Sequence, residues 1–331
     1  MNPKPWLVIT SINYPTAAIK EFCSHANRGN MRMVVVGDTK TPVDWEYPSV
    51  DFLSLHSQSK LFSEFADALP FKHYSRKNLG YVYALKEGAT HIFDTDDDNL
   101  PYPEWSLNLK EDLLADLLSG ENWANVYTHY SSTGIWPRGL PLNYIHKPGQ
   151  LRERVNIKAP IKQYLADCDP DVDAIFRLVN QGETRFNKRP YPIAVDRGVY
   201  VPFNSQNTVI SRQAACLLYL PSFVSFRMTD IWRSFIAQRI SWEMGWSLVF
   251  DNASLFQVRN EHDLMIDFQS EIPGYLRNQE IGRLLSSLNL SGKDLDSCLV
   301  TCYESLVEAQ IVDGRELPLL KLWIKAVEHA D

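Results

Sequence analysis

The sequence lacks an excess of basic residues, a long apolar run and a basic leader segment. Its 33 Lys and Arg face 40 Asp and Glu, so the formal net charge is −7. This charge does not favour nucleic-acid binding, which needs cations to neutralise phosphates. No window approaches the roughly 18 apolar residues of a membrane span, and no secretory signal opens the chain. We therefore expect a soluble, cytoplasmic protein without an integral membrane segment, with peripheral attachment to a membrane left open.

Cysteines are also few, and internal repeats and low-complexity segments are absent. The five cysteines are an odd number at no framework spacing, which predicts reduced thiols rather than disulfides. The chain has 331 residues, of which 45% are hydrophobic. That composition is sufficient for one large domain, or for a domain with a helical appendage.

The first hundred residues alternate between apolar runs and helical patterns. We predict strands at Trp6–Thr10, Met31–Val36 and Thr90–Phe93, a weaker strand at Val50–Leu55, and helices at 17–26, 62–68 and 76–87. Such alternation is typical of a parallel, doubly wound sheet. These sheets bind ligands at the carboxyl ends of their strands, where the loops 11–13, 38–40 and 94–99 would meet.

The rest of the chain is less regular until its last third. The pattern favours a helix at Leu107–Leu118, a strand at Asn125–Tyr130 and a helix from Asp230 to Gly245. From Ile272 onward apolar residues recur every three or four positions, which indicates helices. We therefore predict an α/β domain over 1–270 and a helical subdomain over 271–331.

A cluster of carboxylates follows the strand at Thr90–Phe93. Asp94, Asp96, Asp97 and Asp98 would repel one another unless a cation lies among them. Magnesium and manganese favour carboxylate oxygens, completed by substrate phosphates. Asp96 and Asp98 point the same way in extended backbone and form the best metal pair. Asp97 would point to the other face, Asp94 would contact the ribose or stabilise the loop, and both are candidates for nucleotide binding. A solvated acidic turn is the alternative.

Other polar residues fit the same kind of site. Arg76 and Lys77 open a helix, where two cations would bind a diphosphate, although a basic surface turn would look the same. Thr10 ends a predicted strand, Asn13 and Asp38 lie in the loops after predicted strands, and all three would contact the nucleoside.

Candidates for chemistry lie further along the chain. Asp230 is either a helix cap or a general base that takes a proton from an acceptor hydroxyl. Arg233 would bind negative charge nearby. His262 is a candidate metal ligand or phosphate donor, although a lone histidine is more often an ordinary surface or core residue.

Polar residues between these candidates would recognise sugar hydroxyls. They could equally cap a helix or fill turns. The candidates for substrate contact are Asp173, Arg177, Asn204, Gln206 and Asn207.

Several blocks together resemble the STELLO-type glycosyltransferases. The blocks are Arg76–Gly80, Ile92–Asn99, Asp169–Leu178, Pro202–Thr208, Asp230–Arg233 with Gln238-Arg239, and Arg259-Asn260 with His262–Leu264. A more distant similarity is to the reversibly glycosylated polypeptides, which act as UDP-arabinopyranose mutases. The resemblance implies a GT-A fold, a mixed sheet flanked by helices, with a nucleotide-sugar donor and a divalent metal. It places the metal at Asp96–Asp98 and at His262, and the acceptor-activating acid at Asp230.

The resemblance also implies a function. We expect a glycosyltransferase dependent on Mn²⁺ or Mg²⁺ that uses a nucleoside-diphosphate sugar, expected to be a UDP-sugar, and a glycan or other hydroxyl acceptor. Residues 1–100 would form the nucleotide-sugar-binding half and 101–270 the acceptor half. A sugar-nucleotide mutase and a non-catalytic assembly scaffold of the same fold are the alternatives. A homodimer through the helical tail is also left open.

Overall fold

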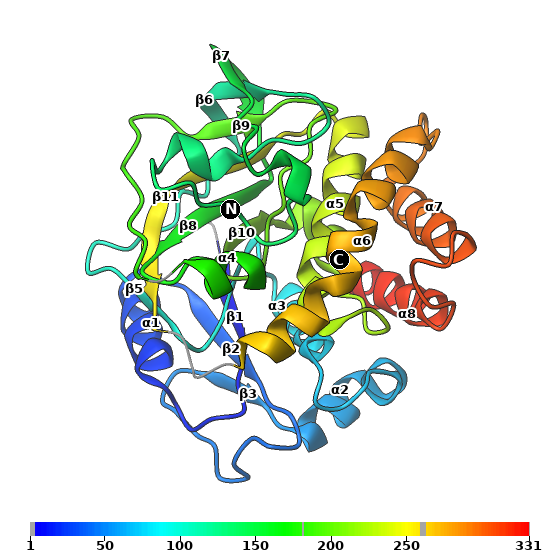
Figure 1. Ribbon diagram of the computed structural model, residues 1–331. Helices are drawn as coiled ribbons and strands as arrows, with labels where there is room; N and C mark the ends of the chain where they lie inside the picture. The colour runs from blue at the N-terminus through cyan, green and yellow to red at the C-terminus, as the bar shows by residue number, and fades with distance from the viewer. Residues whose placement is uncertain (1–3, 181, 259–262, 331) are drawn as a thin grey trace.

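A mixed sheet runs through the protein in the computed structural model, which describes residues 4–180, 182–258 and 263–330. Its strands follow the order β3-β2-β1-β4-β10-β8-β11-β9-β6-β7, and β5 pairs with β11 (Figure 1). The strands are β1 (Pro5–Thr10), β2 (Arg32–Val36), β3 (Asp51–Leu53), β4 (His91–Thr95), β5 (Asn99–Pro101), β6 (Asp112–Ser119), β7 (Gln150–Lys158), β8 (Ile161–Asp167), β9 (Ile193–Val195), β10 (Asn207–Ser211) and β11 (Leu248–Gln257).

The first four strands in the sheet order are parallel, as the sequence predicts. β1 lies between β2 and β4, and β3 pairs with β2. β10 then joins β4 in the antiparallel direction, so the full sheet is mixed. Because the parallel strands end at one edge, the loops after β1, β2 and β4 lie together there. This architecture is the one expected of a GT-A-like fold.

Helices cover both faces of the parallel part of the sheet. Alternate residues of β1 point to opposite faces: Trp6 and Val8 pack in one core cluster, and Leu7 and Ile9 in another. The helix α1 covers the second face, while α2, α3 and the C-terminal helices lie on the first. The helices are α1 (Ala17–Arg28), α2 (Leu55–Ala68), α3 (Lys77–Lys86), α4 (Ala174–Val179), α5 (Thr229–Glu243), α6 (Leu264–Ser287), α7 (Leu295–Glu308) and α8 (Glu316–Glu328).

The C-terminal helices predicted from the sequence are confirmed, and they pack on the rest of the chain. Trp323 of α8 is fully buried among Phe65, Tyr81 and Tyr219, which come from three other segments. Its indole Nε1 donates to the carbonyl of Cys216 at 2.9 Å. The helical tail therefore shares its core with α2 and α3. No helix within the described ranges has the length and apolar character that a membrane crossing requires.

Two predictions in the middle of the chain are wrong. Residues 107–118 do not form a helix, because residues 112–119 pair as β6 between β7 and β9, and this pairing outweighs the local preference of the leucines. Residues 126–129 form a 3₁₀ turn instead of a strand. Asn125 caps this turn and donates to the carbonyls of Ile135 and Ile145, which fixes the loop that follows.

The glycine at position 80 lets α3 approach the sheet. A Cβ there would lie 2.6 Å from Val8 Cγ1 and 2.7 Å from Val36 Cγ2. Gly80→Ala gains about 1 kcal/mol of helix propensity, but overpacking costs about 1–3 kcal/mol. We therefore expect a net loss of stability in urea denaturation. Gly314→Ala is the control, since its new Cβ meets only Val307 at 3.7 Å. Equal stability of the two variants would contradict the close approach.

Candidate functional site

A cavity of about 410 Å³ opens at the carboxyl ends of β1, β2 and β4, the edge that the sequence predicts. The loops after these three strands form one wall. Residues from the segments around 138, 171, 206 and 227–230 form the opposite wall. The predicted site residues that line the cavity are Thr10, Asn13, Asp38, Arg76, Asp96, Asp97, Asp98, Gln206 and Asp230.

The three consecutive carboxylates after β4 are each held by different partners. Asp96 Oδ1 accepts hydrogen bonds from Tyr74 Oη at 2.6 Å and from Lys77 Nζ at 3.2 Å. Asp98 Oδ2 accepts from Gln257 Nε2 at 2.9 Å. Burial raises the pKa of Asp96, and the nearby Lys77 ammonium opposes that rise. The three half-buried carboxylates thus have fixed positions in the wall of the cavity.

Asp97 ties the loop after β1 to the loop after β4. Its Oδ2 accepts from Ser11 Oγ at 2.5 Å and from Asn13 Nδ2 at 3.2 Å, and its carbonyl accepts from Thr16 Oγ1 at 2.6 Å. Thr16 is also the N-cap of α1. These contacts give Asp97 a positioning role in which neutral donors hold its negative charge at the cavity.

Asp94 lies behind the cavity in a buried ion network. Its two carboxylate oxygens lie 2.6 Å from Lys77 Nζ and 3.1 Å from Arg233 Nη1. Both Lys77 and Asp94 have completely buried side chains. Burial opposes the charged form of Lys77, but Asp94 and Asp96 outweigh it and raise the pKa of the ammonium. The structure therefore places Lys77, Asp94 and Arg233 beneath the site, and not at its surface as expected.

The remaining N-terminal candidates are partly committed to the local fold. Arg76 donates from Nε to Gln58 Oε1 at 3.0 Å and from Nη1 to the Leu69 carbonyl at 3.1 Å. Asp38 Oδ2 accepts from the backbone N–H of His73 at 3.2 Å. Both side chains still line the cavity.

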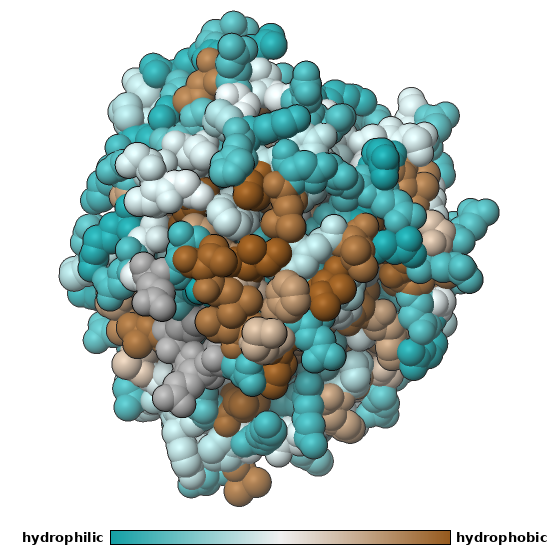
Figure 2. Space-filling model, in the orientation of Figure 1, coloured by the Kyte–Doolittle hydropathy of each residue, from teal (hydrophilic) through white to brown (hydrophobic). Residues whose placement is uncertain are grey.

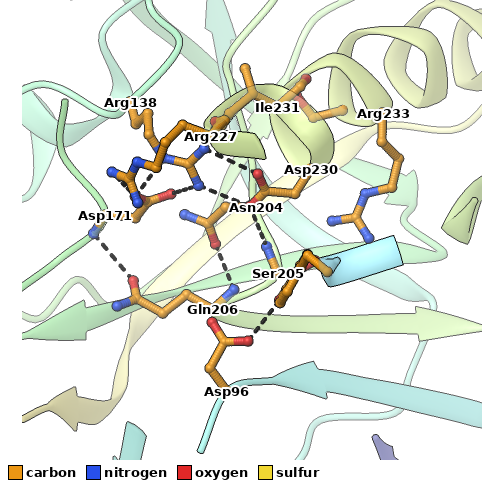
Figure 3. A network of polar contacts seen from close by, with 12 residues as sticks. Asp96, Arg138, Asp171, Asn204, Ser205, Gln206, Arg227, Asp230, Ile231 and Arg233 are labelled. Carbon is orange, nitrogen blue, oxygen red and sulfur yellow. Dashed lines mark hydrogen bonds and ion pairs between the residues drawn. The ribbon is translucent and has the colours of Figure 1, made fainter. Parts of the chain in front are cut away.

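Arg138 forms the centre of the opposite wall (Figure 3). One edge of its guanidinium holds Asp171, with Nε and Nη2 donating at 2.8 and 2.7 Å. The other edge holds Asp230, with Nη1 and Nη2 donating at 3.1 and 2.9 Å. Nη1 also donates to the carbonyl of Arg227. All five N–H donors of the arginine are thus used. We call this arrangement the arginine clamp.

The arginine clamp stabilises the charged forms of buried groups. Burial alone would raise the pKa of Asp171, but the Arg138 guanidinium lowers it to about 2. Burial opposes the charged form of Arg138 as well, and Asp171 and Asp230 together raise its pKa. Asp230 Oδ2 also accepts from the backbone N–H of Ser205 at 3.2 Å, which fixes its orientation.

The other predicted substrate contacts lie outside this cavity, and most support the fold. Asp173 is fully buried and caps α4, and burial raises its pKa to about 6. Asn204 accepts from the backbone N–H of Gln206, and Asn207 donates to the Leu165 carbonyl. Arg177 pairs with Asp169 and lines a second cavity.

A divalent metal fits the donors that the cavity offers. Asp96, Asp97 and Asp98 supply only oxygen ligands, as Mg²⁺ and Mn²⁺ favour. Within the described ranges, no group of three or more His, Cys, Asp or Glu is arranged as a complete metal cage. The donors therefore suit an ion that one or two carboxylates share with substrate phosphates. His262, the third predicted ligand, lies outside the described residues.

Several lining residues were missed by the sequence reasoning, among them Gln257, Tyr74, Asp171 and Arg138. Gln257 is the last residue of β11 and follows an apolar run, and this position in the sequence could have marked it as a residue at the ligand-binding edge. Tyr74 precedes the basic pair by two residues and offered a weaker one. Asp171 was visible only as part of an acidic turn. Arg138 lies in a loop rich in proline and glycine, where no periodicity marks it, and only its partners reveal it.

The fold and the site thus combine a GT-A-like sheet with carboxylates at its ligand-binding edge. Residues 227–330, which include Asp230, match the family model of the STELLO glycosyltransferases. The similarity that the sequence motifs predict is confirmed by this match.

Two relatives from Arabidopsis thaliana extend the similarity beyond that segment. "Probable glycosyltransferase STELLO1" is 29% identical over 292 residues, covering 79% of this chain and 37% of that protein. "Probable glycosyltransferase STELLO2" is 28% identical over 291 residues, covering 79% of this chain and 38% of that protein. The aligned part is thus less than two fifths of each relative.

Removing the clamp should destabilise the protein strongly. Arg138→Met leaves Asp171 and Asp230 buried without their counter-ion, which costs about 3–5 kcal/mol of unfolding free energy. Arg154→Met is the control. The Arg154 side chain is 39% exposed and pairs with Asp116, and ion pairs with such exposure contribute about 1 kcal/mol or less. Urea denaturation measures both. A loss at Arg138 no larger than at Arg154 would show that the clamp is unimportant for folding.

The clamp also predicts a pH dependence. The pKa of Asp171 falls to about 2 in the folded protein, so its ionised form stabilises the fold above the unfolded pKa of about 3.9. This contribution, roughly 2 kcal/mol, is lost as pH falls from about 4 towards 2. We expect the stability advantage of wild type over Asp171→Asn to shrink as pH falls from 5 to 3. Urea denaturation measures the two unfolding free energies. A difference between them that stays constant from pH 5 to pH 3 would show that the ionised form of Asp171 does not stabilise the fold.

Proposed function

We propose that the protein is a metal-dependent glycosyltransferase that uses a nucleoside-diphosphate sugar, with a UDP-sugar as the expected donor. One observation carries the proposal: the carboxylates of Asp96–Asp98 and of Asp230 line opposite walls of the same cavity. Donor activation and acceptor deprotonation need carboxylates at two such places. The similarity to the STELLO glycosyltransferases supports the same activity.

Asp96 and Asp98 are the proposed metal ligands. Bound Mn²⁺ or Mg²⁺ would supply charge stabilisation for the departing diphosphate. The protein's own part is to hold these carboxylates still. Tyr74 and Lys77 fix Asp96, and Gln257 fixes Asp98.

The loops after β1 and β2 are the proposed nucleoside site. Thr10, Asn13 and Asp38, which lie at or just after the ends of these strands, line the cavity. Lys77 is the cation that the sequence predicts at the diphosphate, but its side chain is buried and its ammonium pairs with the carboxylates of Asp94 and Asp96. Lys40 and Lys72 line the cavity and replace it as the proposed diphosphate contacts, together with Arg76.

Asp230 is the proposed general base. A carboxylate has about four lone-pair positions, and the clamp and the Ser205 N–H occupy three of them. The remaining position, on Oδ1, can accept the proton of an acceptor hydroxyl. The hydroxyl oxygen then forms the new bond to the anomeric carbon, and the nucleoside diphosphate departs with the electron pair of the broken bond. A glycan or another hydroxyl compound is the proposed acceptor, and a cytoplasmic location stays a prediction.

Titration with UDP tests the proposed donor site. We expect wild type to bind UDP in calorimetry more tightly with Mn²⁺ than without it. Asp98→Asn should lose most of that manganese-dependent gain while it keeps a wild-type circular dichroism spectrum. Asp112→Asn, on the exposed start of β6, is the matched control. Manganese-dependent binding that survives in Asp98→Asn, or its absence in wild type, would overturn the proposed donor site.

The reaction class has its own test. Incubation with UDP-arabinopyranose and no acceptor interconverts the ring forms only if the protein is a mutase. We expect the pyranose form to stay unchanged in chromatography, and transfer or slow hydrolysis to be the only loss of donor. Appearance of the furanose form would replace the transferase by a mutase.

A further inference from the structure

A second cavity of about 850 Å³ lies beside the first one. Its walls come from the loop after β5, the segment around α4 and the end of β11. We call it the lateral groove. Residues of interest in its lining are Tyr102, Cys168, Phe176, Arg177, Asn180 and Phe256. Its volume is within the range of small-molecule sites in proteins.

The lateral groove adjoins the acid cluster through one side chain. Gln257 lines both cavities. Its Nε2 donates to Asp98 Oδ2 at 2.9 Å, and its Oε1 accepts from Gln206 Nε2 at 2.9 Å. A ligand in the lateral groove that contacts Gln257 would therefore lie close to the proposed metal ligand Asp98.

Charges in the lateral groove balance one another. Arg177 donates to Asp169 and to the carbonyl of Pro170 at 2.8 Å. Arg185 lies 3.8 Å from Glu183, and both residues line the groove. Among the lining residues that the structure describes, two cations thus face two anions, which selects against a strongly charged ligand. A phosphate or an acidic chain would need an excess of one sign.

The groove also offers partly exposed aromatic faces. Tyr102, Phe176 and Phe256 are half-buried, and Tyr102 packs on Phe256 with ring centroids 5.4 Å apart. Aromatic faces provide apolar area, and the amide of Asn180 provides a neutral donor and acceptor. Figure 2 shows that apolar side chains gather on this side of the molecule, over α4 and the first turns of α6.

We propose that the lateral groove is the acceptor site and that it holds a neutral oligosaccharide. This inference rests on the proposed transferase function and adds the chemical class of the acceptor. A sugar chain meets all three observations: it is uncharged, it stacks on aromatic faces, and its terminal hydroxyl could lie at Gln257, which also lines the cavity that contains Asp230.

Cys168 provides the means to test the lateral groove. It is partly exposed and lines the groove, whereas Cys23, Cys216, Cys298 and Cys302 are buried. N-ethylmaleimide should therefore add first to Cys168, as mass spectrometry can verify, and fill part of the groove. Cys168→Ser treated in the same way is the control for alkylation elsewhere. Asn180→Trp narrows the groove without any reagent.

Calorimetry is performed on the full chain with UDP and Mn²⁺ present. The neutral probes are cellohexaose, maltohexaose and xylohexaose, and the anionic probe is tri-galacturonic acid. We expect at least one neutral probe to bind, and its affinity to fall at least tenfold after alkylation of wild type or in Asn180→Trp. Treatment of Cys168→Ser should not change its affinity.

The outcomes separate this proposal from the one before it. Absence of neutral-probe binding, preference for the anionic probe, or equal affinity before and after alkylation would each overturn the acceptor assignment while UDP binding persists. A dimer in sedimentation that alkylation dissociates, without oligosaccharide binding, would make the groove an interface between two copies. Loss of UDP binding in untreated wild type would instead refute the donor site.

Discussion

Asp94 is the residue on which the geometry of the site depends. Its carboxylate joins Lys77 at the start of α3 to Arg233 on α5, and it lies on β4 itself. Arg233 follows Asp230 by three residues on the same helix, so the pairing that fixes α5 against β4 also fixes the proposed base. Lys77 in turn contacts Asp96 at the cavity. A buried carboxylate behind the cavity thus helps to set the positions of two carboxylates that line it.

Burying so many charges is costly, and the structure limits the cost by giving Lys77, Asp94 and Arg138 more than one charged partner each. Lys77 Nζ donates to the Thr95 carbonyl and to Tyr74 Oη besides its two carboxylates. Buried ion pairs contribute little net stability, but they penalise any arrangement that leaves a partner uncovered. We infer that these pairs serve mainly to hold one arrangement of the walls. The free energy of folding comes instead from apolar packing, for example around Trp323 in the helical tail.

The sequence allows part of this arrangement to be predicted. The parallel strands and the loops after them follow from local apolar runs, which is why Asp96 and Asp98 were correctly expected at one edge. Burial cannot be predicted from the sequence in the same way. Lys77 and Arg233 have the sequence context of surface cations, and only their contacts with Asp94, which is distant in sequence, show that they are internal. Arg138 carries no local pattern at all. Residues 107–118 mislead because pairing with β7 and β9 decides their conformation.

A second chain of contacts connects the two walls through the cavity surface. The sequence of contacts is Asp98 to Gln257, Gln257 to Gln206, Gln206 to the backbone N–H of Asp171, and Asp171 through Arg138 to Asp230. Together with the buried route through Asp94, it closes a ring of polar contacts around the site. Each amide in the ring has one donor end and one acceptor end, so its orientation is set by its neighbours. Two routes, one through Gln257 and Arg138 and one through Asp94, thus connect the walls. Together they resist relative motion of the walls more than either route would alone. The distance between the proposed metal ligands and the proposed base is therefore a property of the whole ring.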